Sequence, residues 1–577
     1  METRWDVASL EPAKTEFLCT ELGISPLLAR LLINRGVGTP EEAGAFLNGD
    51  IRRLHNPFLM EGMKAAVARI FEAVEQDQKI LVYGDYDVDG ITATAVLRRA
   101  LEMLGGCVDH YIPRRLEDGY GLRKEVIERA KESGRKLILT VDSGIRDFEA
   151  CRRARELGLD LIVTDHHLPA DRLPEAFAVL NPKQSGCSYP DKDLAAVGVA
   201  FKLVDALFRE AGRAEAVPHF LKLVAIGTIA DMVPMRGENR ILVKAGLEGL
   251  SQPYNLGLQG LLQGAGVSRK VSTFDIAFKV APRINAFTRM GGSGEAVDLF
   301  SLDDPEQVTA LVAEMNRRNT LRRAEEERIL REIEERVAAQ DPAFGRDFLL
   351  LAGKGWHRGV IGNVAARVVE KFHRPALIVS LSSERCQGSG RSIPGFHLLK
   401  ALETCDASFS AYGGHAQAVG CTLSSKQATQ PELEALAEAL AEYASVTIQP
   451  EMRAPSVRID AILDLEEVTY ELCDEMGRLA PHGIGNPEPI LASRQVEVVG
   501  GPWVLKERHL KLRARRNGSH LDAIWWRRGD VAAKVRPGHK VDLAYSLSRE
   551  CFRGQDNLLL TVQDLVPVAS SGPVAAK

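Results

Sequence analysis

Residues 79–90 read KILVYGDYDVDG, a short apolar run that ends in three alternating carboxylates and a glycine. Similar apolar runs, most of them leading into acids or histidines, recur at residues 107–113, 136–144, 159–167 and 177–182. Segments with helical periodicity separate these runs. Short strands that alternate with helices are typical of βαβ units, so we predict an α/β fold built on a mainly parallel sheet.

The rest of the sequence predicts further domains, because 577 residues exceed what one hydrophobic core holds. Glu-to-Arg pairs at helical spacing after Pro305 predict a long connecting helix. A second, smaller α/β pattern follows, and then short alternating runs that predict a β-barrel. We place the divisions at an N-terminal helical segment 1–50, a parallel-sheet domain 51–304, a connecting helix 305–345, a smaller α/β domain 346–450, a barrel 451–567 and a disordered tail 568–577.

Composition and charge are those of an ordinary globular protein, with 26% charged and 45% hydrophobic residues. The net charge of −5 gives no global signal for nucleic acid. Between residues 501 and 530, however, eight Lys or Arg stand against three Asp or Glu. We interpret this basic stretch as a candidate contact for a phosphate backbone.

The cysteines and the N-terminal sequence indicate the cellular compartment of the protein. Nine cysteines are scattered without a CxxC pair, as in reduced cytosolic proteins. The first residues lack the apolar core of a signal peptide, and no run of about 18 apolar residues occurs. We therefore expect a cytoplasmic protein that does not associate with membranes.

Acids and histidines follow three of the predicted strands and end one predicted helix. Because the carboxyl ends of parallel strands meet at one edge of a sheet, we expect these side chains to converge there. The helix that ends in Asp231 places an acid where the helix dipole disfavours it, which a nearby cation would explain. The candidates are Asp85, Asp87, Asp89, Asp142, Asp165, His166, His167 and Asp231.

Each motif alone also has an ordinary explanation: a polar turn for the aspartate triplet, a surface pair for the histidines, a frayed helix end for Asp231. Convergence of three strand ends on one edge favours a metal site. Carboxylates with few imidazoles and no thiolate suit two divalent cations, Mg²⁺ or Mn²⁺, rather than structural zinc.

The motifs DYDVDG, VDSG, TDHH and GTIADMVP occur in the order found in the DHH phosphoesterase superfamily, which this sequence resembles. Within that superfamily it is similar to the RecJ exonucleases through IPRRLEDGYGL, VGVAF, APRIN, SGRS, GGHAQAVG and ERHLKL. The likeness covers residues 80–564. It implies a DHH domain, a DHHA1 domain facing the metal site and an OB-like barrel.

The resemblance also implies a function: a 5′-to-3′ exonuclease specific for single-stranded DNA, which hydrolyses phosphodiesters with two metals in DNA repair and recombination. A helicase and a single-strand-binding protein are the implied partners. Asp87 would bind one metal and Asp89 the other, with Asp142 bridging them. His166 and Asp231 would complete the second metal. The implied catalytic residues are Asp87, Asp89, Asp142, His166, His167 and Asp231.

Other roles follow from the same resemblance. Asp85 and His167 match motif positions whose residues either bind a metal directly or support its ligands, and Asp165 would orient the ring of His166 from outside the ligand set. Ser389 and Arg391 of SGRS would hold a terminal 5′-phosphate, and His415 would touch the scissile phosphate. The full implied substrate-binding set is Arg115, Arg283, Asn285, Ser389, Arg391, Gly414 and His415.

Aromatic residues of the predicted barrel are candidate stacking platforms for bases, namely Trp503, Trp525 and Trp526. Alternation in a strand places neighbouring side chains on opposite faces, so at most one of Trp525 and Trp526 faces DNA. The remaining aromatic side chains are expected to fill the barrel core.

One motif departs from the RecJ pattern, in which PRINAAGR is usual. Residues 282–289 read PRINAFTR, so Phe287 and Thr288 replace a small pair. The ring either narrows the substrate path or fills a pocket, and it puts a contact from Arg289 in doubt.

Two other functions stay open at this point. One is a DHH phosphodiesterase of short oligonucleotides or cyclic dinucleotides, which would not need a basic third domain. The other is an inactive DNA-binding scaffold, against which the complete metal motifs argue.

Overall fold

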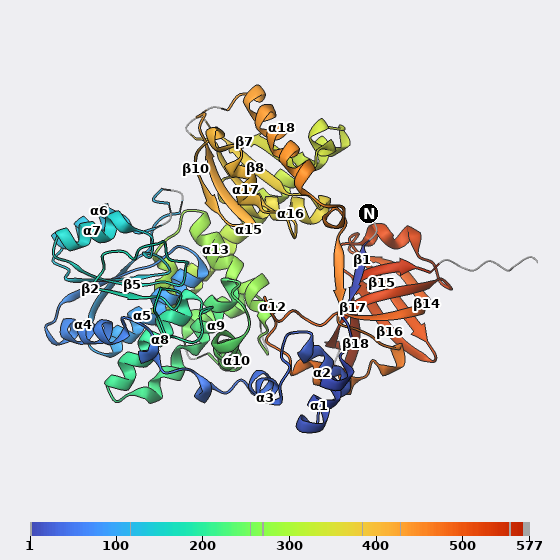
Figure 1. Ribbon diagram of the computed structural model, residues 1–577, viewed down its shortest axis with the longest axis horizontal. Helices are drawn as coiled ribbons and strands as arrows, with labels where there is room; N and C mark the ends of the chain where they lie inside the picture. Colours follow the sequence, from blue (N-terminus) through green and yellow to red (C-terminus); the bar gives the residue numbers. More distant parts are fainter. Residues whose placement is uncertain are drawn as a thin grey trace, which may run out of the picture.

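The computed structural model shows an α/β domain, a second α/β domain and a β-barrel (Figure 1). The fold class predicted from the sequence is thereby confirmed. Most of the predicted disordered tail lies outside the described residues. The structure describes residues 3–568 except 116, 120, 254, 268–269, 383–384, 427 and 553–554.

The first domain is built on a five-stranded, fully parallel sheet of order β3-β2-β4-β5-β6. Its strands are β2 (Lys79–Tyr83), β3 (Cys107–Tyr111), β4 (Leu137–Val141), β5 (Asp160–Thr164) and β6 (Ala178–Leu180). Each of the five strands lies within the apolar run that predicted it.

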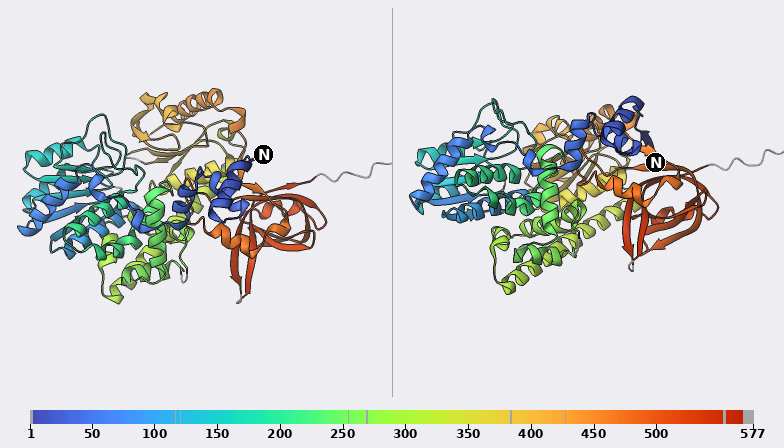
Figure 2. Two further views of the ribbon diagram at one scale, coloured as in Figure 1. Left: turned by 60° about the horizontal axis from the view of Figure 1, so that its bottom comes forward. Right: turned by 90° about the horizontal axis from the view of Figure 1, so that it is seen from below.

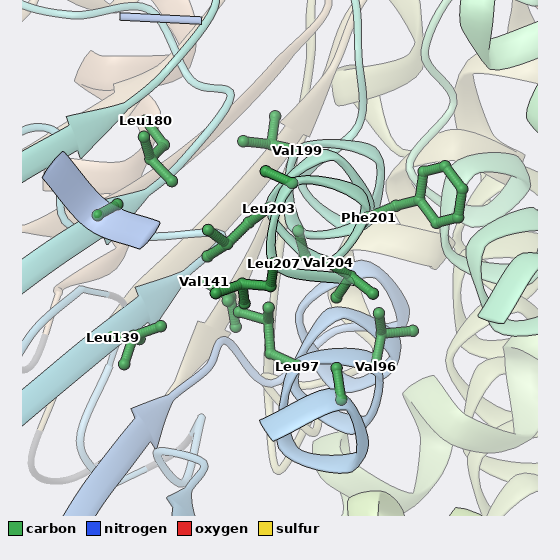
Figure 3. Packing of buried hydrophobic residues seen from close by; sticks show 14 of the residues in the cluster. Val96, Leu97, Leu139, Val141, Leu180, Val199, Phe201, Leu203, Val204 and Leu207 are labelled. Atoms are coloured by element: carbon green, nitrogen blue, oxygen red, sulfur yellow. The ribbon is translucent and has the colours of Figure 1, made fainter. Parts of the chain in front are cut away.

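Helices cover both faces of this sheet. One face packs against α4 (Met63–Glu75), α5 (Val88–Met103) and α8 (Ala196–Glu210). Figure 3 shows Leu139 and Val141 of the sheet opposite side chains of α5 and α8. The other face packs against α6 (Lys124–Glu132) and α7 (Phe148–Glu156). Burial on both faces explains why the strands read as continuous apolar runs.

A helical layer extends the domain beyond α8 and packs on the far side of α5. It contains a π-helical turn, Ile276–Val280, that leads directly into α13. The helices are α9 (Leu221–Ala230), α10 (Gly237–Leu250), α11 (Leu256–Gly264), α12 (Thr273–Asp275), α13 (Ala281–Arg289) and α14 (Glu295–Asp298).

The predicted connecting helix is present as α15 (Pro305–Ala338) and leads to the second domain. That domain has a mixed sheet of order β10-β11-β9-β8-β7, in which only β7 and β8 run parallel. Its elements are β7 (Leu349–Lys354), α16 (Ile361–Phe372), β8 (Ala376–Leu381), β9 (Gln387–Arg391), α17 (Leu398–Glu403), β10 (Phe409–Gly414), β11 (Ala418–Leu423) and α18 (Gln430–Thr447).

The third domain is a barrel of order β14-β15-β16-β18-β17, closed by pairing of β14 with β17. Closure leaves no free edge among these five strands. The elements are β12 (Ser456–Ile459), β13 (Ala461–Ile462), α19 (Tyr470–Gly477), β14 (Leu491–Leu505), β15 (His509–Arg516), β16 (Ser519–Trp525), β17 (Lys540–Phe552) and β18 (Gln555–Pro567).

The N-terminal segment belongs structurally with the barrel, although the two lie at opposite ends of the sequence. Its first element is a strand, β1 (Arg4–Val7), which pairs in parallel with β12. The helices α1 (Pro12–Leu22), α2 (Pro26–Ile33) and α3 (Pro40–Asn48) share one hydrophobic cluster with the barrel interior. Both views of Figure 2 place these blue helices beside the red barrel. The sequence predicted the helices but not their partner.

A buried arginine fastens this unit to the first domain. Arg240 of α10 is 2% exposed and donates hydrogen bonds to five backbone carbonyls, those of Phe46, Arg478, Leu479, Ala480 and Pro481. Its guanidinium also lies 3.8 Å from the centroid of the Phe46 ring. Burial, and then the charge of Arg35, lower the pKa of Arg240 to about 10.

We expect Arg240→Met to destabilise the junction strongly, because the substitution leaves several buried carbonyls without donors. Each unsatisfied group costs about 1–3 kcal/mol, so a loss of about 3–5 kcal/mol is expected. Scanning calorimetry should show a Tm lower by several degrees. The exposed Arg213, which donates to the Met103 carbonyl, supplies the control Arg213→Met. Equal Tm shifts in both variants would contradict this role for Arg240.

Candidate metal centre and substrate cleft

The candidate ligands do converge at the carboxyl edge of the parallel sheet. Their ligand atoms form three overlapping groups, in each of which all atoms lie within 4.8 Å of one another. The groups are Asp85 with Asp87 and Asp142, Asp89 with His166 and Asp231, and Asp142 with His166 and His167. Because Asp142 and His166 each belong to two groups, the three sets form one continuous cluster.

Two helix N-termini hold the aspartates of the first motif. Asp87 is the N-cap of α5, and its side chain accepts a hydrogen bond from the Gly90 amide at 3.1 Å. Asp89, 1% exposed, accepts from the amides of Ala196 and Val197 at 2.7 and 2.8 Å, at the start of α8. Backbone amides and the positive ends of two helix dipoles therefore partly offset the crowded negative charge.

Asp142 and Asp165 are fixed by the strands that precede them. Asp142 takes a left-handed backbone conformation, φ +61°, and its amide bonds the Thr164 carbonyl of the neighbouring strand. Asp165 accepts the amides of His166 and His167 and lies 2.8 Å from Nδ1 of the His167 ring. The expected contact of Asp165 with the His166 ring is therefore wrong: the carboxylate bonds the His166 backbone and orients the His167 ring.

His166 lies between Asp142, which follows β4, and Asp231, which follows α9. Its Nε2 is 3.3 Å from Asp142 Oδ1 and its Nδ1 is 3.6 Å from Asp231 Oδ2. Within the described part of the chain, neither ring nitrogen has a hydrogen-bond partner, and the buried atoms Asp231 Oδ2 and Asp85 Oδ1 also lack one. Buried polar groups are nearly always satisfied. These atoms fit the donor set of divalent cations.

The pKa values of the ligand residues reflect the crowding of carboxylates in this cluster. Burial, and then the charges of neighbouring aspartates, hold the pKa values of Asp85, Asp142 and Asp231 well above the usual range. Burial and the charge of Asp87 raise the pKa of Asp89 to about 7. Burial and the nearby His167 lower the pKa of His166 to about 3, so its imidazole is neutral and able to act as a ligand. Cations would relieve the repulsion among the carboxylates.

A cleft of about 670 Å³ opens beside this cluster, between the first and second domains. Tyr86, from the aspartate motif, lines it together with Arg115, whose guanidinium lies 4.7 Å from the Tyr86 ring centroid. Ser389 and Arg391 of β9 line the opposite wall. The predicted residues Arg115, Ser389 and Arg391 thus share one cleft.

Arg289 joins these residues, although the departure at Phe287 had put it in doubt. It lines the cleft, and burial together with the charges of Arg115, Arg322 and Arg391 lowers its pKa to about 10. Phe287 is 2% exposed and packs in the core, with the Arg318 guanidinium 4.4 Å from its ring centroid. The ring therefore fills a pocket and does not narrow the cleft.

Four other predicted substrate residues do not line this cleft. Arg283 donates to Asn316 Oδ1 at 2.6 Å and to the carbonyls of Gly264 and Lys279, so its contacts are with the protein. Asn285 stands on the same helix, α13. Gly414 ends β10 and His415 follows it in the exposed turn before β11.

Comparison with known proteins agrees with this geometry. Three family descriptions match the chain: "DHH family, N-terminal domain" at residues 79–228, "DHHA1 domain" at 345–445 and "RecJ OB domain" at 459–564. The single-stranded-DNA-specific exonuclease RecJ of Bacillus subtilis is 36% identical over 97% of this chain and 70% of its own length. The chain belongs to the RecJ family.

Other RecJ proteins show the same relationship. RecJ of Escherichia coli is 33% identical over 94% of this chain and 96% of its own length. The crystal structure of RecJ from Thermus thermophilus in complex with Mn²⁺ matches with a TM-score of 0.83 at 30% identity, over 98% of this chain and 79% of that one. A Mg²⁺ complex of the same protein matches with a TM-score of 0.77.

In the barrel of this RecJ family chain, five of the eight cations of the basic stretch 501–530 form ion pairs. Lys511 and Arg513 both pair with Asp522, and the other paired residues are Arg515 with Glu497, Arg516 with Asp464 and Arg528 with Asp530. Trp525 is 7% exposed and Trp526 is 51% exposed, as strand alternation predicted. Trp503 is also exposed. Within residues 501–530, as far as the structure describes them, the cations without an ion pair are Lys506, Arg508 and Arg527, which are near these two exposed rings in sequence.

Sequence reasoning missed two residues that shape the RecJ site. Lys183 donates from Nζ to the His166 carbonyl at 2.7 Å and faces the ligand cluster from the loop after β6. Gly227 of α9 packs so closely that a Cβ would lie 2.3 Å from Thr92 Oγ1 and 3.0 Å from Asp89 Oδ1. The GT of GTIADMVP was a visible signal for Gly227; Lys183 had none.

Gly227→Ala should therefore displace Asp89 and weaken divalent metal binding by about 10- to 100-fold, as for other residues that support ligands. Isothermal titration of the purified protein with Mn²⁺ measures the change. Gly44→Ala serves as a control, because no atom lies within 4 Å of a Cβ built there. Unchanged Mn²⁺ affinity in Gly227→Ala would show that Asp89 is not a ligand.

Proposed function

We propose that the protein is an exonuclease that degrades single-stranded DNA from its 5′ end, using two divalent cations, Mn²⁺ or Mg²⁺. The observation that carries the proposal is the pair of adjoining ligand groups, Asp85 with Asp87 and Asp142, and Asp89 with His166 and Asp231, at the mouth of an arginine-lined cleft. Membership of the RecJ family supports the choice of substrate.

In this proposal Asp142 is shared between the two cation positions, because it belongs to the first group and its Oδ1 lies 3.3 Å from Nε2 of His166 in the second. Two cations held by these groups would supply an acidified water and neutralise the phosphate oxygens. Asp165 fixes the His167 ring through Nδ1, and the His167 side chain is 44% exposed, so the ring is positioned to contact a bound substrate. Catalysis needs no protein nucleophile.

We attribute the 5′-end polarity of digestion to the wall of the cleft that β9 and the start of α16 form. Ser389 Oγ lies 3.3 Å from Arg391 Nη1, and a Cβ on Gly362, in the first turn of α16, would lie 3.1 Å from that hydroxyl. A hydroxyl, a guanidinium and a helix N-terminus therefore meet at one place, which suits a terminal phosphate. Burial and the charge of Arg115 lower the pKa of Arg391, so a bound anion would stabilise the charged guanidinium.

The setting in the cell is also part of the proposal. Within the described residues, no helix is both long and apolar enough to cross a membrane. The scattered cysteines support a cytoplasmic location. A DNA-unwinding enzyme and a single-strand-binding protein are the proposed partners, since a substrate restricted to one strand has to be generated and kept unpaired.

Asp142→Ala should reduce hydrolysis of single-stranded DNA by about 10³-fold or more, because shared metal ligation contributes several kcal/mol to transition-state stabilisation. End-labelled single-stranded and duplex DNA, digested with Mn²⁺ or Mg²⁺, measure rate, strandedness and direction together. EDTA should abolish activity and added Mn²⁺ should restore it. Asp109→Ala, on β3 and paired with Arg135, is the matched control. Near-normal turnover in Asp142→Ala would refute the two-metal assignment.

Arg391→Ala should reduce the preference for a 5′-phosphorylated end by about 10- to 150-fold, the equivalent of one charge-assisted contact of about 1.5–3 kcal/mol. The measurement is kcat/KM for 5′-phosphate and 5′-hydroxyl substrates in wild type and variant. Arg453→Ala, whose arginine pairs with Asp347, is the control. If both substrates lose equally, Arg391 does not contact the terminal phosphate.

A further inference from the structure

Two phenylalanines stand exposed side by side on the segment that leads into α13. Phe274 of α12 and Phe278 of the π-helical turn are 60% and 61% exposed. Their ring centroids lie 4.8 Å apart with the planes tilted by 34°. Contiguous exposed apolar surface, unlike scattered single residues, is typical of interaction sites. We call these two residues the Phe274–Phe278 pair.

The pair sits on a rigid support close to the metal cluster. Ile276 and Val280, on the inner side of the same turn, are fully buried and belong to the hydrophobic cluster that contains Ile226 and Ile229 of α9. Asp231 is the residue that follows α9. The turn that presents the two rings therefore packs on the helix that delivers a candidate metal ligand.

Other exposed apolar side chains surround the connection between α9 and α10. Met232, next to Asp231, is 68% exposed and has a left-handed φ of +61°. Ile484, from the barrel side, is 48% exposed, and its carbonyl accepts the Met235 amide at 2.6 Å. Figure 1 draws α12 at the edge of the first domain that faces the barrel. The element that carries Phe274 therefore faces the barrel, and the turn that carries Phe278 packs on the helix that ends before Asp231.

Next to the pair, Asp275 and Lys279 form an ion pair at 2.6 Å, and an arginine follows on α13. Arg283, one turn beyond Phe278, is tied to Asn316 of α15. Burial and the charge of Arg323 lower the pKa values of both Arg283 and Arg322, which places Arg323 beside them. Arg322 in turn lowers the pKa of Arg289 in the cleft. Arg289, Arg322, Arg323 and Arg283 therefore lie near enough to influence one another in turn, from the cleft to the turn beyond Phe278, although Arg322 is paired with Glu326.

We propose that the Phe274–Phe278 pair is a stacking platform for unpaired bases of the DNA strand as it passes between the barrel and the metal cluster. Aromatic faces beside a cationic track are the features that hold single strands without reading sequence. Base pairs expose no free face for such stacking, so the platform favours single strands. The inference rests on the proposed function, because it assumes a DNA substrate.

The test measures DNA binding without turnover. A 3′-fluorescein-labelled strand of about 20 nucleotides, longer than one single-strand binding site, is titrated with full-length protein in EDTA, and anisotropy reports the affinity. The double variant Phe274→Leu/Phe278→Leu keeps the apolar character and removes the aromatic faces. Phe17→Leu, at a 51% exposed phenylalanine on α1, is the matched control. The double variant should bind about tenfold more weakly, and the control should bind as wild type does.

A scan with single abasic sites locates the platform on the strand. In the wild type, one or two abasic positions should weaken binding about tenfold, and the same positions should have no further effect in the double variant. An identical abasic profile in both proteins would overturn the inference, as would unchanged affinity of the double variant. A change in oligomeric state without a change in DNA affinity would also overturn it, since the pair would then be a self-association surface. If the wild type binds single strands no better than duplexes, the proposed function itself fails.

Discussion

Mutual repulsion among carboxylates buried at one edge of the parallel sheet is the constraint on which the rest of this structure depends. Asp85, Asp89 and Asp142 are almost fully buried in one continuous ligand cluster. Backbone amides at the N-termini of α5 and α8 donate hydrogen bonds to Asp87 and Asp89 and offset part of this charge. The remaining charge is left for cations to neutralise. Helix positions, the tight fit of Gly227 and the strained backbone of Asp142 all serve this arrangement.

The sequence predicted this edge well because the relevant signals are local. Each ligand motif follows its own strand or ends its own helix, and parallel topology alone brings the strand ends together. Asp142 and His166 could therefore be placed in one site without knowing any side-chain contact. The barrel and the long helix α15 were predictable for the same reason, since alternation and charge spacing are properties of short windows.

Features that depend on distant partners were not predictable. Arg283 and Arg289 stand on neighbouring turns of α13, yet one contacts α15 and the other lines the cleft. Asp165 orients His167 rather than His166 because the turn geometry decides which ring it reaches. Cations of the basic stretch of the barrel pair with acids elsewhere in the fold, such as Lys511 with Asp522 and Arg515 with Glu497. The spacing of these residues in the sequence predicts none of these side-chain contacts.

The pairing of β1 with β12 has a consequence for how the chain is made. Trp5 donates from Nε1 to Asp564 at 2.6 Å, a contact between residues 559 positions apart. At about 5–20 residues per second, ribosomal synthesis delivers the β12 partner roughly 20–90 s after β1. During that interval the apolar faces of α1 to α3 have no barrel to pack against. The parallel-sheet domain, whose strands lie between residues 79 and 180, can fold before these helices meet their partner.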